Sequence, residues 1–185
     1  MPRTLQIIAE QQRAMSSALL AVRTIARKAL RSGERPDFSR LMPLVDYVER
    51  FPETLHQPNE EKHLFRVLEA REPAMARLVA RLRRDHAAMK GYGQRLRTAV
   101  SYWRTGDPNA GRQTALMADD YVRFCRRHAR AERQDLLPAA AKLLSDAEWS
   151  KIDQALGAVV DPLAASRSRQ DCALALKQMA NRPAP

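Results

Sequence analysis

The sequence is poor in the residues that β-sheets and disulfide frameworks depend on. Its 185 residues include 6 glycines and 2 cysteines, and aromatic residues make up only 5%. Alanine, leucine and arginine are abundant instead, and these residues favour helices, whereas strands favour β-branched and aromatic residues. The two cysteines, Cys125 and Cys172, cannot build a disulfide framework. The composition therefore predicts an all-α protein.

Long apolar segments are also missing. No apolar run approaches the roughly 20 residues that a helix needs to cross a bilayer. The N-terminal stretch MPRTLQIIAEQQR has neither an uninterrupted hydrophobic segment nor a small-residue cleavage site, so it does not resemble a signal peptide. We expect a cytoplasmic protein that is not bound to a membrane.

Positive charge is in clear excess. The chain has 32 Lys and Arg residues against 21 Asp and Glu residues, which gives a formal net charge of +11. Such an excess is compatible with an anionic partner such as nucleic acid or a membrane surface. The arginines are dispersed, however, rather than grouped beside aromatic residues that could stack on bases. This spacing favours exposed helix faces over a nucleic-acid partner, and it leaves a partner protein open.

Apolar residues recur at steps of three and four along four segments, as is typical of amphipathic helices. We predict these helices at about residues 4–30, 37–70, 73–104 and 111–137. Because the links between them are short, the pattern predicts an up-down-up-down four-helix bundle over residues 1–160, followed by a C-terminal tail over residues 161–185.

Prolines and one capping box predict where these helices change. Because proline lacks an N–H group, Pro52 and Pro58 predict a kink or break in the second helix, and Pro138 predicts an interruption of the fourth. Ser145 and Glu148 form a capping box that opens a short fifth helix.

Two His/Glu pairs repeat the same spacing inside helical segments. Glu60 follows His56, and Glu132 follows His128, by four residues, about one helical turn, so both side chains of a pair leave the same face. His86 lies on the apolar stripe of the helix between the two pairs. Facing helical hairpins with inward side chains of this kind build the metal sites of four-helix bundles.

The register that buries the apolar stripes also directs these ionisable residues inward. Burying five such groups without a cation would be very costly. Mixed imidazole and carboxylate ligands suit iron, manganese or zinc. The sequence therefore predicts a metal centre, and its candidate ligands are His56, Glu60, His86, His128 and Glu132.

Three segments resemble the helix signatures of the bacterial hemerythrin-like, or HHE cation-binding, domains. They are FPETLHQPNEEKHLF, RRDHAAM and RFCRRHARAERQDLLP, and the later turn LSDAEW also fits. The resemblance covers roughly residues 4–160 and matches five ligand positions in order. It implies a non-haem centre of two iron ions, bridged by carboxylates and an oxo or hydroxo group, in preference to manganese or zinc. Such centres bind dioxygen, and in related proteins they handle peroxide or nitric oxide.

The first helix departs from this family pattern. Where the family has a histidine after an acidic residue, this chain reads EQQR, and Gln12 takes the place of the histidine. A glutamine is a weak neutral ligand, so the metal on that side should be held less firmly. His63 and Asp135, one turn beyond the two His/Glu pairs, are further candidates. For His63 the spacing fits a ligand or a hydrogen-bond partner of a ligand, and for Asp135 it favours the second role or a partly exposed acid.

Two classes of function follow. In the first, the protein is a di-iron protein that binds or reduces a small oxidant, namely dioxygen, peroxide or nitric oxide. In the second, it is a metal-responsive or metal-free helical module that acts through a partner protein. The sequence leaves open whether the protein is an enzyme, a carrier or a sensor.

Overall fold

The structure, a computed structural model, describes residues 2–157, and every regular element in this range is helical. This result confirms the all-α prediction. None of the helices in the described range is long and apolar enough to span a membrane. The predicted tail over residues 161–185, the boundary after residue 160 and Cys172 lie outside the described residues.

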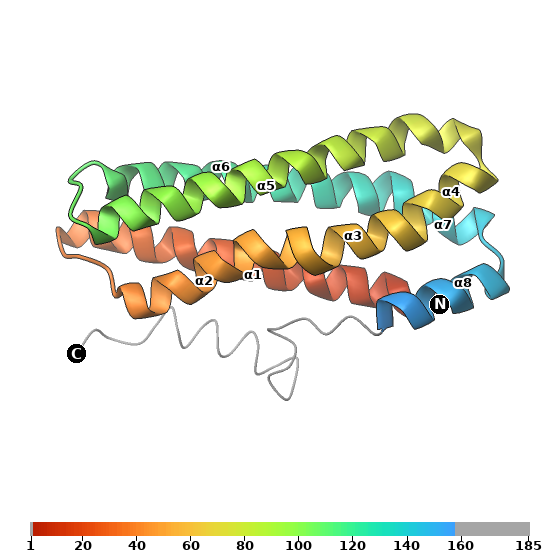
Figure 1. The fold of residues 1–185 in the computed structure, drawn as a ribbon, viewed down its shortest axis with the longest axis horizontal. Coiled ribbons are helices and arrows are strands. Elements are labelled where there is room, and N and C mark those ends of the chain that lie inside the picture. Colours follow the sequence, from red (N-terminus) through yellow and green to blue (C-terminus); the bar gives the residue numbers. More distant parts are fainter. Residues whose placement is uncertain (1, 158–185) are drawn as a thin grey trace.

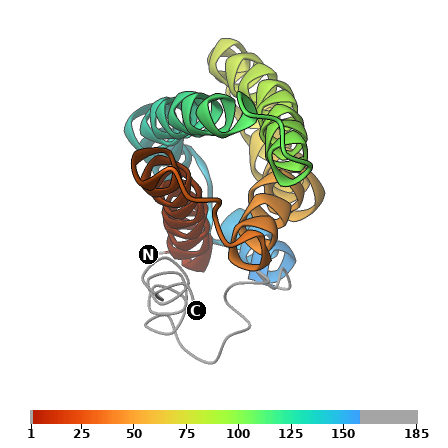
Figure 2. The same cartoon turned by 90° about the vertical axis from the view of Figure 1, so that its left-hand side faces the viewer.

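Four long helical segments lie alongside one another (Figures 1 and 2). The first is α1 and the third is α5, whereas the second and fourth are runs of shorter elements. Contacts join α1 to α2, α2 to α5, α5 to α6 and α6 to α1, so each long segment packs against two others. The elements in chain order are α1 (Arg3–Ser32), α2 (Phe38–Phe51), η1 (Pro52–His56), α3 (Gln57–Glu60), η2 (Glu61–Phe65), α4 (Arg66–Arg71), η3 (Pro73–Met75), α5 (Ala76–Arg104), α6 (Ala110–Ala131), η4 (Glu132–Leu136), α7 (Leu137–Leu143) and α8 (Asp146–Gly157).

Local sequence explains where several of these elements begin and end. Gly33, at φ 73°, closes α1, and its N–H donates to the carbonyl of Ala29. Asp37 caps α2 by accepting a hydrogen bond from the N–H of Ser39. The predicted capping box is present before α8, because the backbone N–H of Ser145 donates to the Glu148 carboxylate at 2.8 Å.

The prolines accompany irregular turns, and the helical segments do not break at them. The second segment does not break at Pro52 or Pro58, and the fourth continues past Pro138 to Leu143. Each of these two segments instead contains π-helical turns, in which an N–H donates to the carbonyl five residues earlier. Pro58 and Pro138 each follow directly after the residue that closes such a turn. The wider turn accommodates a residue that has no N–H and that would clash with a carbonyl in a regular α-helix.

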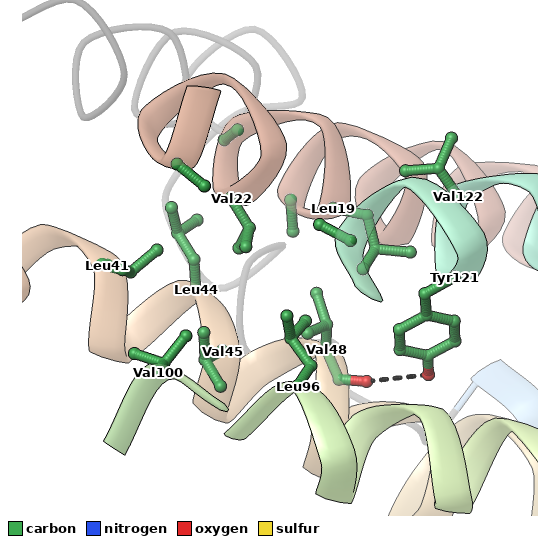
Figure 3. Close-up of a cluster of buried hydrophobic side chains, with 14 of the residues drawn as sticks. Leu19, Val22, Leu41, Leu44, Val45, Val48, Leu96, Val100, Tyr121 and Val122 are labelled. Carbon is green, nitrogen blue, oxygen red and sulfur yellow. Dashed lines mark hydrogen bonds between the residues drawn. The ribbon is translucent and has the colours of Figure 1, made fainter. Parts of the chain in front are cut away.

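Two clusters of buried apolar side chains fill the bundle at different levels. One contains Leu19, Val48 and Leu96, and in it the hydroxyl of Tyr121 donates to the carbonyl of Val48 at 3.1 Å (Figure 3). The other contains the side chain of Leu82 together with residues of η2, η4 and α8. Because α1, α5 and α6 each contribute to both clusters, each helix passes from one to the other. The polar residues of the candidate site lie between the two clusters.

Candidate metal centre

Four buried side chains from three segments form one compact polar group. Glu60 ends α3, His86 lies on α5, His128 lies on α6 and Glu132 begins η4. Each offers one ligand atom, and these four atoms all lie within 4.8 Å of one another. Both glutamates have 0% exposure. The four residues are called the four-ligand group below.

Most donor atoms of the four-ligand group have no hydrogen-bond partner among the described residues. This is true of both carboxylate oxygens of Glu60 and of Nε2 of His86, whereas Nε2 of His128 and Oε1 of Glu132 form an ion pair at 2.9 Å without hydrogen-bond geometry. Burying a polar atom without a partner costs free energy, and burying a charge costs more. Imidazole nitrogens and carboxylate oxygens are the donors that iron, manganese and zinc accept. The group therefore fits a metal cation.

The electrostatics of the group point the same way. Burial and the nearby Glu132 raise the pKa of Glu60 well above its usual value, because both disfavour a second negative charge. Burial would also raise the pKa of Glu132, but His128 beside it lowers that pKa to about 2. Burial, together with the charge of His128, lowers the pKa of His86 to about 3, so this ring is neutral and able to coordinate. A bound cation would favour the ionised form of both carboxylates.

Each of the two site histidines has a carboxylate near the other side of its ring, at hydrogen-bond distance for His86 but not for His128. In His86, the Nδ1 atom lies 2.6 Å from a carboxylate oxygen of Glu61. In His128, the Nδ1 atom lies 3.5 Å from a carboxylate oxygen of Asp85. The Nε2 atoms face the glutamates, at 3.6 Å from Glu60 for His86 and 2.9 Å from Glu132 for His128. A carboxylate that binds one ring nitrogen and leaves the other for a metal is the usual arrangement around metal-ligating histidines.

His56 has the same arrangement at the edge of the group. Its Nδ1 lies 2.7 Å from Oε1 of Gln11, and its Nε2 lies 3.9 Å from Oε2 of Glu60. Its side chain is 12% exposed, more than the buried histidines. His56 is not one of the four side chains whose donor atoms meet within 4.8 Å, so the structure places it beside the four-ligand group.

The π-helical turns lie at the site itself. His56 ends η1, Glu60 immediately precedes η2, and Glu132 begins η4. A π-turn shifts the residues that follow it around the helix axis, and such turns are frequent at functional sites. The directions of these side chains therefore depend partly on the π-turns, which the regular spacing of four residues does not describe.

Gln12 contacts the group but does so through its nitrogen. Its Nε2 donates a hydrogen bond to Oε2 of Glu132, and its Oε1 accepts one from Nη1 of Arg133 at 3.3 Å. The side chain at the position where the family has a histidine is thus a hydrogen-bond donor to a ligand.

The structure does not bring His63 or Asp135 into the group. His63 is only partly buried, and it makes no hydrogen bond or ion pair with another residue in the range 2–157. It lies inside the π-turn η2, where the regular α-helical spacing from Glu60 does not apply. Asp135 is exposed to solvent.

Sequence reasoning did not identify Gln11, Glu61 and Asp85, the residues that lie near Nδ1 of the three rings. Each is the immediate neighbour of a residue that the sequence did single out. An adjacent residue points about 100° away on a helix, so spacing rules that select one face pass over it. An acidic neighbour beside a predicted ligand was the available signal.

A small cavity lies next to the four-ligand group, beside His56 and His128. It has a volume of about 30 Å³, and its lining includes Met15, Met89, Cys125, His56 and His128. Such a volume admits one or two molecules the size of water. Cys125 is buried, and burial raises the pKa of its thiol. A neutral thiol and two thioethers give this cavity a largely apolar wall beside the imidazoles.

The helical bundle and its buried imidazole–carboxylate group suggest a metal-binding helical protein. The family model for the hemerythrin HHE cation binding domain matches residues 3–140. The chain therefore belongs to this family. No curated protein and no solved structure gave a match.

Proposed function

We propose that this protein is a non-haem iron protein whose centre binds or reduces a small oxidant: dioxygen, peroxide or nitric oxide. The observation that carries the proposal is the set of unpartnered donor atoms in the four-ligand group, which lies next to a cavity large enough for such a molecule. The family supports iron, with manganese or zinc as alternatives.

The residues divide into two roles in this proposal. Glu60, His86, His128 and Glu132 would hold the metal, and His56 would stand at the side of the cavity. Bound iron would supply a Lewis acid and a one-electron redox centre for the small ligand.

The protein would also shield the centre from bulk water. The two apolar clusters lie on either side of the site along the bundle, and Met15 and Met89 line the cavity. In such a low-dielectric environment, the interactions between the bound cation and its carboxylate ligands are stronger than in water.

Metal analysis of protein purified without added metal, combined with an absorption spectrum before and after peroxide, tests the proposal. Iron in the protein and a spectrum that changes on addition of peroxide are expected. A matched His86→Ala variant should lose both, because it removes a donor atom from the four-ligand group.

Two results would contradict the proposal in different ways. Protein that binds zinc alone, with no spectral response to peroxide, would rule out the redox function but keep the metal site. Protein that binds no metal after reconstitution with ferrous iron, manganese or zinc would favour a metal-free module that acts through a partner protein.

A further inference from the structure

We propose that the centre of this chain holds a single metal ion, because Gln12 occupies the side of the group where a second ion would need a ligand. This inference rests on the proposed metal site and concerns the number of ions in it. It follows from the direction of one amide group.

The direction of the Gln12 amide is fixed by its two neighbours. A carboxylate accepts hydrogen bonds and a guanidinium only donates them. Gln12 lies between Oε2 of Glu132 and Nη1 of Arg133, so its nitrogen must face Glu132 and its oxygen must face Arg133. The amide oxygen, which is the atom of glutamine that binds metals, therefore points away from the four-ligand group.

The same hydrogen bond changes what Glu132 can do. A carboxylate that bridges two ions uses one oxygen for each. Oε2 of Glu132 already accepts the hydrogen bond from Gln12, whereas Oε1 lies 2.9 Å from Nε2 of His128 and has no hydrogen-bond partner among the described residues. Glu132 is thus prepared to bind one ion through Oε1.

One ion has enough ligands, and a second has too few. The four-ligand group supplies four donor atoms within 4.8 Å of one another. Donors at about 2.1 Å from one ion lie at most about 4.2 Å apart, so small movements of the side chains complete this site. A second ion would find Nε2 of His56 and the remaining oxygen of Glu60, two donors where such metals usually take at least four.

The test counts the metal ions bound per chain in four proteins reconstituted with ferrous iron and freed of excess metal. The wild type should hold one ion. Gln12→Glu, which keeps the shape of the side chain but replaces the donor N–H₂ with a ligand oxygen, should hold two ions, as should Gln12→His. Gln12→Ala is the matched control, because it removes the hydrogen bond without adding a ligand, and it should hold one.

Electron paramagnetic resonance of the oxidised proteins gives a second readout that does not depend on activity. A lone high-spin ferric ion gives a signal, whereas a spin-coupled ferric pair is silent. The wild type and Gln12→Ala should therefore give the signal, and it should fall in Gln12→Glu and Gln12→His as the second ion enters.

The outcomes separate this inference from the proposed function. Two ions in the wild type would overturn the single-ion centre while supporting the proposed metal site. One ion in the wild type and in both ligand-adding variants would show that Gln12 is not the cause. No ion in any of the proteins would overturn the metal site itself. Because Gln12→Glu and Gln12→His differ in size, misfolding of one leaves the other to decide.

Discussion

A carboxylate oxygen of Glu61 lies 2.6 Å from Nδ1 of His86, and this contact turns the opposite nitrogen of the ring toward Glu60. The two residues come from different segments, η2 and α5. Glu61 also lies 3.8 Å from Arg83, which pairs with Glu69. His86 thus links the four-ligand group to the ion-pair network of Glu61, Arg83 and Glu69.

The first prediction is that Glu61→Ala weakens metal binding without abolishing it. The ring of His86 would lose the contact that fixes its tautomer and direction, and changes of this kind typically cost about 10–100-fold in metal affinity. Competition with a chelator of known affinity measures the loss. Glu69→Ala is the control, because it removes a bidentate partner of Arg83 without touching His86. An equal loss in both variants would assign the effect to Arg83 rather than to His86.

The second prediction concerns the two buried glutamates. Replacing Glu60 or Glu132 by Ala should sharply lower the metal content of purified protein, because each removes a charged donor from the four-ligand group. Asp135→Ala tests the specificity of this effect, since Asp135 is a nearby carboxylate that is exposed. Full metal content in either glutamate variant, measured by elemental analysis of folded protein, would contradict the ligand assignment.

The sequence was sufficient to predict the helices and four side chains that meet inside the bundle, because both follow a simple periodicity. Residues three and four apart share a helix face, and the His/Glu pairs and apolar stripes obey that rule. Glu60, His86, His128 and Glu132, predicted on this basis, meet in one group in the structure.

The remaining features depend on how one helix is rotated against another. The contact between Glu61 and His86 joins two segments, so spacing within either segment does not reveal it. The π-turns at the site likewise depart from regular α-helical spacing: His63 lies inside one of them and is not in the four-ligand group, and the fourth segment continues past Pro138. Periodicity also says nothing about the direction of the Gln12 amide, which Arg133 and Glu132 determine together.

The third prediction concerns the stability of the protein without metal. Removal of the metal leaves two buried carboxylates and two imidazoles facing one another, so the apo-protein should melt at a lower temperature than the metal-bound protein. Metal at 100 times its dissociation constant adds about 2.7 kcal/mol to the free energy of unfolding. Differential scanning calorimetry with and without chelator measures the difference.

Glu60→Gln is the matched variant for this experiment. It replaces a buried carboxyl, whose negative charge is disfavoured there as its raised pKa indicates, with a neutral amide of the same shape, so its apo form should melt higher than the wild-type apo form. It should also lose most of the increase that metal produces. An identical melting temperature for the wild type with and without chelator would argue against the metal site.

The last prediction concerns Asp153, a residue of α8 that caps the start of α1. Its carboxylate accepts hydrogen bonds from the N–H groups of Arg3 and Thr4, at 3.0 and 2.7 Å, and from the Thr4 hydroxyl at 2.6 Å. The N-cap residue of α1, Pro2, makes no side-chain capping bond, so α8 supplies the cap instead. In metal-free protein, Asp153→Ala should lower the free energy of unfolding by about 1 kcal/mol, as is typical for the loss of a cap.

This effect should depend on pH in one direction. Burial raises the pKa of Asp153, but the hydrogen bonds from Thr4 and Arg3 outweigh it, so the pKa in the folded protein lies below 3.8. An acid whose pKa is lowered by folding stabilises the protein above its unfolded value and loses that contribution as the pH falls through its folded value. Urea unfolding of metal-free protein should therefore show a constant difference between wild type and Asp153→Ala above about pH 5 and a shrinking difference below pH 3.8. Asp120→Ala, which removes an exposed carboxylate paired with Arg123, should change stability little at either pH. A difference for Asp153→Ala that stays the same down to pH 3 would show that the charge of the carboxylate does not contribute to the cap.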